Sequence, residues 1–185
     1  RSTQCRSSAA SDVYKRQLVE MPFIDVSEDP VRPELSLEFR QSHGRKIYGI
    51  KDEEGDIAAV MCFAFTHDIP KSVEEMDVMS KDAAMQAVHR AGVQGSKAIA
   101  YTVWAKKKGG GKHMVNEVYK MIKESHHIDR LITLSPLTDM ARKFHLKNGA
   151  KEVQVNLTTQ NFEYEVELTE WEKFRDKAKK VLRIA

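Results

Sequence analysis

The pattern of apolar and polar positions is clearest over residues 98–150. An apolar run rich in β-branched and aromatic residues (99–104) leads into a basic, glycine-rich turn and then a stretch with helical spacing. A second apolar run (131–134) precedes a second helical pattern, which ends at Gly149. Strand, glycine loop, helix, strand and helix in this order predict two parallel strands joined by a right-handed helical crossover.

The N-terminal half of the chain shows strand, hairpin and helix patterns. Apolar positions within residues 23–26 suit a first strand, and residues 34–41 fit a strand or a short helix equally well. Residues 46–70 are the clearest hairpin, with an acidic turn and glycine at 52–55. Residues 71–96 predict one or two short helices, and our hypothesis is that they cover a substrate entrance.

Two further strands and a helix are expected at the C-terminal end. Residues 151–157 and 162–168 alternate apolar and polar side chains around a turn at 158–161. Helical spacing with a lysine-rich polar face starts at Thr169. The order of elements predicts an α/β (α+β) fold, with a mixed sheet and helices on both faces.

Composition indicates a soluble globular protein that acts in the cytoplasm. The chain has 185 residues, of which 41% are hydrophobic and 31% charged, and no apolar run is long enough to span a membrane. The net charge of +3 comes from interspersed acids and bases, so it does not indicate a nucleic-acid partner. Cys5 and Cys62 form neither a disulfide framework nor a metal-binding spacing, so we expect no metal.

The first residues differ from the rest of the sequence. Residues 1–17 are rich in Ser, Ala, Arg and Gln and lack an apolar period, so we expect a non-native or disordered leader. Met21 is a plausible native start. We expect residues 18–185 to form a single domain.

The glycine loop between the central strand and its helix suits an anion. Unpaired amides at a helix N-terminus, together with the helix dipole, favour negative charge, and several lysines flank the loop. A phosphate-bearing ligand and a solvated basic turn are equally compatible with these residues. Neither the GK[ST] ending of a phosphate-binding P-loop nor the G-x-G-x-x-G dinucleotide fingerprint is present.

The loop resembles the signature of the GNAT acetyltransferase superfamily, Q/R-x-x-G-x-G/A. Residues 106–111 (KKKGGG) match if lysine replaces Gln or Arg, and a shifted match over 108–113 is the alternative. The resemblance extends over about residues 47–168. It implies a mostly antiparallel central sheet with a splayed parallel strand pair, loop amides on the pyrophosphate of coenzyme A, and a strand along the pantetheine arm. The implied cofactor-binding residues are Tyr101, Val103, Lys106, Lys108, Gly109, Gly110, Gly111, Lys112 and His113.

The last helix of the central segment carries the second half of this resemblance. Residues 141–150 (ARKFHLKNGA) are similar to the family pattern A-x-x-x-Y-x-x-x-G-F, whose tyrosine protonates the leaving thiolate. His145 occupies the tyrosine position, and histidine can donate a proton near neutral pH. The resemblance implies acetyl transfer from acetyl-CoA, or another acyl-CoA, to a small amine or a protein amine. His67 and Asp68 are candidate general bases by position alone.

A narrower resemblance indicates a different reaction. Residues 133–136 (TLSP) and 144–150 (FHLKNGA) look like the catalytic half of malonyl-CoA decarboxylase, which implies decarboxylation with Ser135 and His145. The large helical N-terminal domain and the long insert of that enzyme have no counterpart in these 185 residues.

Other interpretations stay open. Ser135 could belong to a helix cap, and His145 could be an ordinary buried helix histidine. Acyl transfer is our leading hypothesis, decarboxylation the second, and a non-catalytic GNAT-fold binding or structural protein the third. An exposed strand or the C-terminal helix could also support a homodimer.

Overall fold

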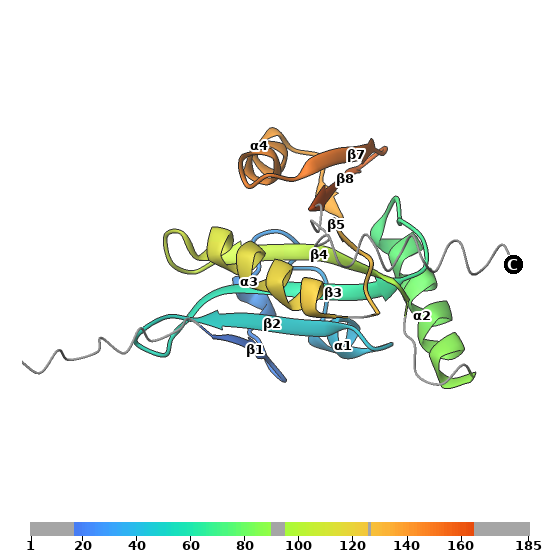
Figure 1. Cartoon of the computed structure of the whole chain (residues 1–185), viewed down its shortest axis with the longest axis horizontal. Coiled ribbons are helices and arrows are strands. Elements are labelled where there is room, and N and C mark those ends of the chain that lie inside the picture. The colour runs from blue at the N-terminus through green and yellow to red at the C-terminus, as the bar shows by residue number, and fades with distance from the viewer. Residues whose placement is uncertain (1–16, 90–94, 126, 165–185) are drawn as a thin grey trace, which may run out of the picture.

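The computed structural model describes residues 17–89, 95–125 and 127–164, which form one mixed sheet with helices around it (Figure 1). The strand order is β1-β2-β3-β4-β5-β8-β6, and β7 pairs with β8. The strands are β1 (Leu18–Glu20), β2 (Lys46–Lys51), β3 (Ile57–Thr66), β4 (Lys97–Ala105), β5 (Arg130–Thr133), β6 (Ser135–Pro136), β7 (Lys151–Val155) and β8 (Thr159–Tyr164).

The sheet is antiparallel except between β4 and β5. These two strands pair in parallel from Lys97 opposite Arg130 to Ala100 opposite Thr133. Beyond Ala100 they diverge, and β8 lies on the far side of β5. The predicted splayed parallel pair in a mostly antiparallel sheet is therefore confirmed.

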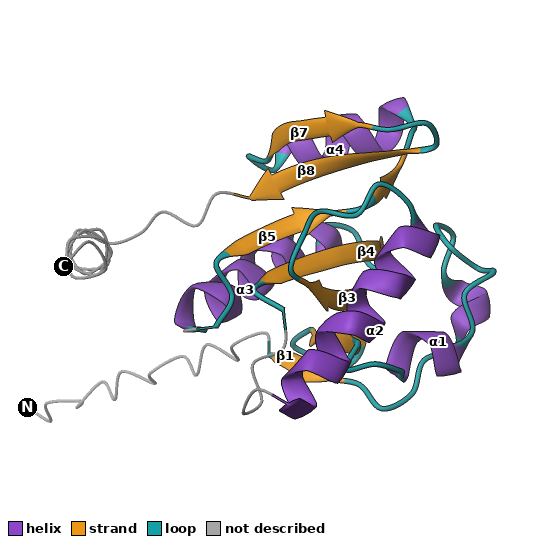
Figure 2. Cartoon of the chain, turned by 90° about the vertical axis from the view of Figure 1, so that its right-hand side faces the viewer, coloured by secondary structure: helices purple, strands orange, loops and turns teal. Residues whose placement is uncertain are grey.

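Helices cover both faces of the sheet, as expected (Figure 2). Helices α1 (Leu37–Gln41) and α2 (Val73–His89) pack on one face, where Met76 is fully buried. Helix α3 (Gly110–Glu124) packs on the other face through buried apolar residues such as Met114. Helix α4 (Asp139–Lys147) contacts β7.

The hairpin formed by β2 and β3 confirms the clearest sequence pattern. Strand β3 is buried along nearly its whole length, because its apolar side chains face a helical layer on either side. The turn is closed by the Asp52 carboxylate, which accepts hydrogen bonds from the amides of Glu54 and Asp56. Gly55 has a φ of +88°, a value that favours glycine.

Two predicted elements differ from the structure. The first strand is β1 rather than residues 23–26, and Val26–Glu28 form a short 3-10 helix, η1, capped by Asp25. Strand β1 precedes Met21 and pairs with β2, so a chain that starts at Met21 would lack this edge strand. Residues 159–161 belong to β8 and not to a turn.

For other segments, the structure decides between the predicted alternatives, or the prediction lies outside the described residues. Residues 34–41 contain the helix α1, whose N-cap Ser36 accepts from the Phe39 amide. The described residues of the segment 71–96 contain one long helix, α2. The predicted C-terminal helix and residues 165–168 lie outside the described residues. Within the described ranges, no helix has the length and apolar character needed to cross a membrane.

Candidate functional site

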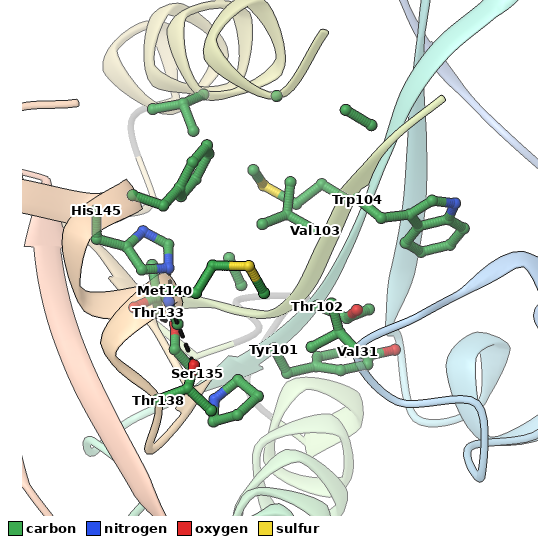
Figure 3. Close-up of a pocket in the computed structure, with 18 of the residues that line it drawn as sticks. Val31, Tyr101, Thr102, Val103, Trp104, Thr133, Ser135, Thr138, Met140 and His145 are labelled. Carbon is green, nitrogen blue, oxygen red and sulfur yellow. Dashed lines mark hydrogen bonds between the residues drawn. The ribbon is translucent and has the colours of Figure 1, made fainter. Parts of the chain in front are cut away.

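A cavity of about 580 Å³ opens where β4 and β5 diverge (Figure 3). Its walls come from β4, the start of α3, the β5–β6 segment and α4. Apolar side chains dominate, and no Asp, Glu, Lys or Arg lines it among the residues that the structure describes. The side chains with hydrogen-bonding groups along it include Thr102, Thr133, Ser135, Thr138, His145 and Tyr164.

Ser135 and His145 meet at the wall of this cavity. The Ser135 Oγ lies 2.8 Å from the His145 Nε2, and both residues are buried. Ser135 begins β6, which pairs with β8, whereas His145 projects from the last turn of α4. The N-cap of α4 is Thr138, whose hydroxyl accepts from the Ala141 amide, so Ser135 does not cap the helix. The two residues that the narrower resemblance singled out therefore form a pair.

The surroundings of His145 keep its imidazole neutral. The ring of Phe162 stacks on it at 4.9 Å, and the ring of Phe144 packs edge-on at 5.1 Å. Burial among these rings lowers the pKa of His145 to about 4, because the charged form loses its hydration. This differs from the expected proton donor near neutral pH, since an imidazolium is scarcely populated there.

Tyr164 extends the hydrogen-bonded pair to a chain. Its hydroxyl lies 2.9 Å from the His145 Nδ1, and burial raises the pKa of this phenol. At the Ser135 end of this chain, the serine hydroxyl donates to the Thr133 Oγ1 at 3.2 Å. The same Thr133 Oγ1 also accepts from the Phe162 amide. Sequence inspection missed Tyr164, since it lies in a strand with no motif of its own.

The strand β4 presents mainly its backbone and small side chains to the cavity. The Tyr101 ring points away from the cavity and packs edge-on against Phe39 on the other face of the sheet (Figure 3). Val103 lines the cavity. From Tyr101 onwards, the described residues include no strand that pairs with β4 on the β5 side. Apart from the Tyr101 carbonyl, which accepts from Arg32, backbone groups on this free edge are available to an extended ligand.

A buried arginine bridges the two diverging strands. The Arg32 Nε donates to the Tyr101 carbonyl at 2.9 Å, and its Nη2 donates to the Leu134 carbonyl at 3.0 Å. Leu134 directly precedes Ser135, so Arg32 ties the position of the serine to β4. Burial lowers the pKa of Arg32. Sequence reasoning also missed this residue, because its partners are 69 and 102 residues away.

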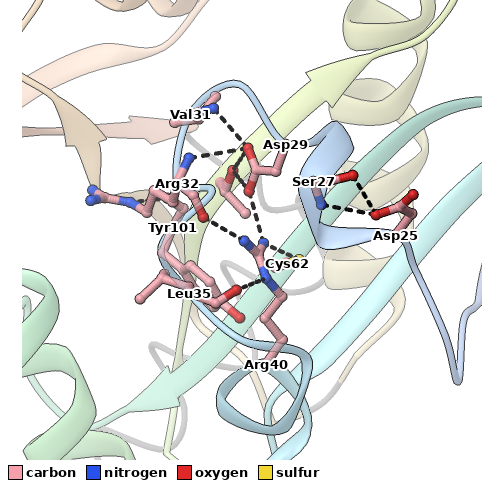
Figure 4. Close-up of polar contacts among 10 residues, drawn as sticks. Asp25, Ser27, Asp29, Val31, Arg32, Leu35, Arg40, Cys62 and Tyr101 are labelled. Carbon is pink, nitrogen blue, oxygen red and sulfur yellow. Dashed lines mark hydrogen bonds and ion pairs between the residues drawn. The ribbon is translucent and has the colours of Figure 1, made fainter.

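A second buried arginine holds the segment that carries Arg32 (Figure 4). Arg40 forms an ion pair with Asp29 at 2.8 Å, and both side chains are fully buried. The same Asp29 carboxylate accepts from the amides of Val31 and Arg32 and from the Thr102 hydroxyl. These contacts fix the cavity-lining residues 30 and 31 against β4.

The glycine loop packs tightly against β3. Gly109 is the N-cap of α3 with a φ of +82°, in the left-handed region that favours glycine. A Cβ at Gly110 would collide with the Ala58 carbonyl, which accepts from the amides of Lys106 and Lys107. Gly111 lines the cavity, so the first turn of α3 faces the site.

The lysines around the loop have different partners. Lys106 forms an ion pair with Glu28, and Lys107 forms one with Asp52 of the β2–β3 turn. Lys108, Lys112 and His113 are exposed, and no ion pair to them is seen within the described ranges. The positive charge next to the first turn of α3 is therefore smaller than the lysine count suggests.

The structure brings some predicted residues together and separates others. Five of them line one cavity: Tyr101, Val103, Gly111, Ser135 and His145. Lys106, Lys108, Gly109, Gly110, Lys112 and His113 lie on or beside the loop and do not line the cavity.

The two candidate bases are not at this cavity. His67 and Asp68 follow Thr66, which pairs with Lys97 at the start of β4, and neither residue lines the cavity. The cavity-lining part of β4 begins at Ala100, and strand rise places it roughly 10 to 25 Å away. No described residue of the segment 71–96 lines the cavity, and the hypothesis that this segment covers a substrate entrance stays a prediction. Within the described residues, no group of three or more His, Cys, Asp or Glu side chains could hold a metal.

Comparison with known proteins identifies the fold of the chain through solved structures. No family model matches the chain, and neither does any curated protein sequence. Malonyl-CoA decarboxylase from Agrobacterium vitis aligns with a TM-score of 0.50 and 16% identity over 69% of this chain and 35% of that chain. GphF, a GNAT-like decarboxylase in complex with isobutyryl-CoA, aligns with a TM-score of 0.53 and 10% identity over 70% of this chain and 83% of that chain.

A GNAT-family acetyltransferase from Listeria monocytogenes also aligns, with a TM-score of 0.44 and 14% identity over 64% of this chain and 63% of that chain. The chain has the GNAT fold, as the sequence resemblance implied. It spans about a third of the length of the Agrobacterium decarboxylase.

Proposed function

We propose that this chain binds an acyl-CoA and decarboxylates a malonyl-type acyl group. The observation that carries the proposal is the pair of Ser135 Oγ and His145 Nε2, 2.8 Å apart at the wall of an apolar cavity. Both groups are neutral hydrogen-bonding groups there, because burial holds the pKa of His145 near 4. A neutral pair can stabilise a developing oxyanion without first gaining or losing a proton.

The reaction needs a place for the electron pair that carbon dioxide leaves behind. When the C–C bond to the carboxylate breaks, its electron pair moves into the thioester and gives an enolate oxyanion. With Nε2–H donating to the Ser135 Oγ, the serine hydroxyl can turn from the Thr133 Oγ1 to donate to that oxygen. The carbanion carbon then takes one proton, and acetyl-CoA and carbon dioxide are the products of malonyl-CoA.

The apolar lining favours this charge movement. A carboxylate in a cavity without charged side chains is poorly solvated, whereas the departing carbon dioxide is neutral. The negative charge moves from the carboxylate to the thioester oxygen, where Ser135 can donate a hydrogen bond. The cavity therefore disfavours the starting charge distribution relative to the transition state.

The coenzyme would bind along the free edge of β4 and at the N-terminus of α3. The pantetheine arm would lie along the free edge of β4, at Tyr101 and Val103, and pass Gly111. The pyrophosphate would sit at the N-terminus of α3, where loop amides and the side chains of Lys108 and Lys112 can reach it. We place no metal in the reaction.

Acyl transfer to an amine is the second candidate. The free β4 edge and the glycine loop would serve an acetyl-CoA equally well. However, a neutral His145 is a poor acid for the leaving thiolate, and the described cavity lining offers no carboxylate that could deprotonate an amine. The site geometry therefore favours decarboxylation over transfer.

The test is incubation with malonyl-CoA in the absence of any amine, followed by chromatography of the thioesters. Decarboxylation gives acetyl-CoA without free coenzyme A, whereas transfer gives free coenzyme A only when an amine is supplied. Ser135→Ala should lower turnover by roughly 100- to 1000-fold, as loss of an oxyanion donor does. Ser125→Ala, at the far end of α3, should not change it. Failure to bind any acyl-CoA in calorimetry would favour the non-catalytic alternative.

A further inference from the structure

A second, smaller cavity is lined by Tyr164, which also lines the proposed reaction site. We propose that this cavity is the solvent end of a proton relay that runs through Tyr164, His145 and Ser135 to the substrate carbon. The inference rests on the proposed decarboxylation, because that reaction consumes one proton for each molecule of carbon dioxide released.

The second cavity is polar and large enough for water. Its volume is about 200 Å³, against the roughly 30 Å³ that one water molecule occupies in the liquid. Amide and phenol side chains supply donors and acceptors for such water. The lining residues are Val115, Asn116, Tyr119, Asn148, Gly149 and Tyr164.

Tyr164 and Val115 contribute to the walls of both cavities. From the Tyr164 hydroxyl to the His145 Nδ1 the distance is 2.9 Å, and from the His145 Nε2 to the Ser135 Oγ it is 2.8 Å. Both distances fall within the range of hydrogen bonds. The hydrogen-bonded chain is therefore continuous from Tyr164, which lines the polar cavity, to Ser135 at the wall of the apolar one.

Each link of this chain can pass a proton while staying neutral overall. The Ser135 hydroxyl gives its proton to the enolate carbon and takes the Nε2 proton of His145. The His145 Nδ1 takes the proton of Tyr164, whose oxygen takes one from water in the second cavity. One water proton thus ends on the acyl carbon, hydroxide is left to solvent, and the imidazole has changed tautomer.

The electrostatics of the buried groups agree with a neutral relay. Burial lowers the pKa of His145 and raises that of Tyr164, so the imidazole is uncharged and the phenol is protonated at neutral pH. A bound acyl group would fill the apolar cavity and exclude water from its own side. Water in the polar cavity would then supply the proton through Tyr164, His145 and Ser135.

The experiment compares Asn116→Leu with Lys120→Leu in the full chain, using malonyl-CoA as substrate. Asn116 is exposed and lines the second cavity, so leucine makes that cavity narrower and less polar. Lys120 is exposed on the same helix and does not line it. Tyr164→Phe removes the first protein link of the relay while keeping the ring.

The readouts are the ¹³C isotope effect at the departing carboxylate and the solvent deuterium isotope effect. In the wild type we expect C–C cleavage to limit turnover, with a large ¹³C effect and a small solvent effect. If reprotonation slows, the enolate recaptures carbon dioxide, so the ¹³C effect falls and the solvent effect rises. We expect this shift in Asn116→Leu and Tyr164→Phe, with turnover lowered by roughly 10- to 100-fold, and no shift in Lys120→Leu.

The outcomes separate the relay from the proposed function. Unchanged isotope effects in both Asn116→Leu and Tyr164→Phe, with wild-type decarboxylation intact, would overturn the relay and leave decarboxylation standing. A wild-type chain that binds malonyl-CoA but releases no carbon dioxide would overturn both. Thermal unfolding of each variant checks that a lower turnover is not a loss of folded protein.

Discussion

At the scale of single residues, burial determines the charge state of His145. Its ordinary pKa of 6.5 falls to about 4 among aromatic rings. A neutral imidazole can hold a hydrogen bond to Ser135 over the whole physiological range. We therefore expect decarboxylation to change little between about pH 6 and about pH 8 through this group.

The same residue makes the fold sensitive to acid. The unfolded chain binds the His145 proton more tightly than the folded chain, so stability is fully present above about pH 6.5 and is lost as the pH falls toward 4. The lowered pKa corresponds to roughly 3 kcal/mol of unfolding free energy. Urea unfolding at a series of pH values should show a steeper acid loss for the wild type than for His145→Gln. Identical pH profiles would contradict the buried neutral histidine.

Arg40 pairs with the buried carboxylate of Asp29, which would otherwise be an unpaired charge in the core. Arg40→Met would strand the Asp29 carboxylate, which is fully buried, and we expect a loss of about 3 to 5 kcal/mol in unfolding free energy. The matched control is Arg142→Met, whose partner Glu152 lies in an exposed ion pair that contributes about 0 to 1 kcal/mol. Urea unfolding measures the loss of unfolding free energy in both variants. Equal effects of the two substitutions would show that Asp29 is not held as described.

At the scale of elements, the packing of α3 against β3 sets the position of the glycine loop. Gly110→Ala would place a Cβ against the Ala58 carbonyl and push the helix start away from the sheet, at a cost of about 1 to 3 kcal/mol. In Gly111→Ala, the added Cβ would lie 3.3 Å from the ring of Phe144. The Phe144 side chain can shift to make room for it. Thermal unfolding should therefore show the larger loss for Gly110→Ala. The reverse order would contradict this packing.

The divergence of β4 and β5 is likewise set by specific contacts between elements. Strand pairing stops at Ala100, and Arg32 satisfies one carbonyl of each side of the opening. Without such a donor, buried carbonyls at the split would be unsatisfied, at a cost of roughly 1 to 3 kcal/mol each. The arginine therefore stabilises an opening that sheet pairing alone would tend to close.

At the scale of the whole molecule, the proposed coenzyme site joins two halves of the fold. One half contributes β4 and α3, and the other contributes β6, α4 and β8 (Figure 1). A ligand that contacts both halves should stabilise the folded chain by mass action, by about 2.7 kcal/mol at a hundredfold excess over its Kd. Coenzyme A should raise the melting temperature more than pantetheine, because only the former carries phosphates for the N-terminus of α3. Equal shifts would remove the phosphate site from the proposal.

The amino-acid sequence was sufficient for features that depend on local spacing. The hairpin of β2 and β3, the parallel pair β4 and β5 and the glycine start of α3 all follow from periodicity and turn chemistry within short segments. The GNAT fold could be predicted because its short motifs stand in the right order along the chain. Weak or short patterns failed, as at β1 and at the start of β8.

The site itself depends on contacts between distant segments. Lys106 and Lys107 have the same local pattern as Lys108, yet they pair with acids on other elements, which no local spacing reveals. Tyr164 reaches the His145 imidazole only because β8 pairs beside β5 and β6. Burial is a property of the assembled core, so the neutral state of His145 and the charge-free cavity lining follow from packing rather than from residue order.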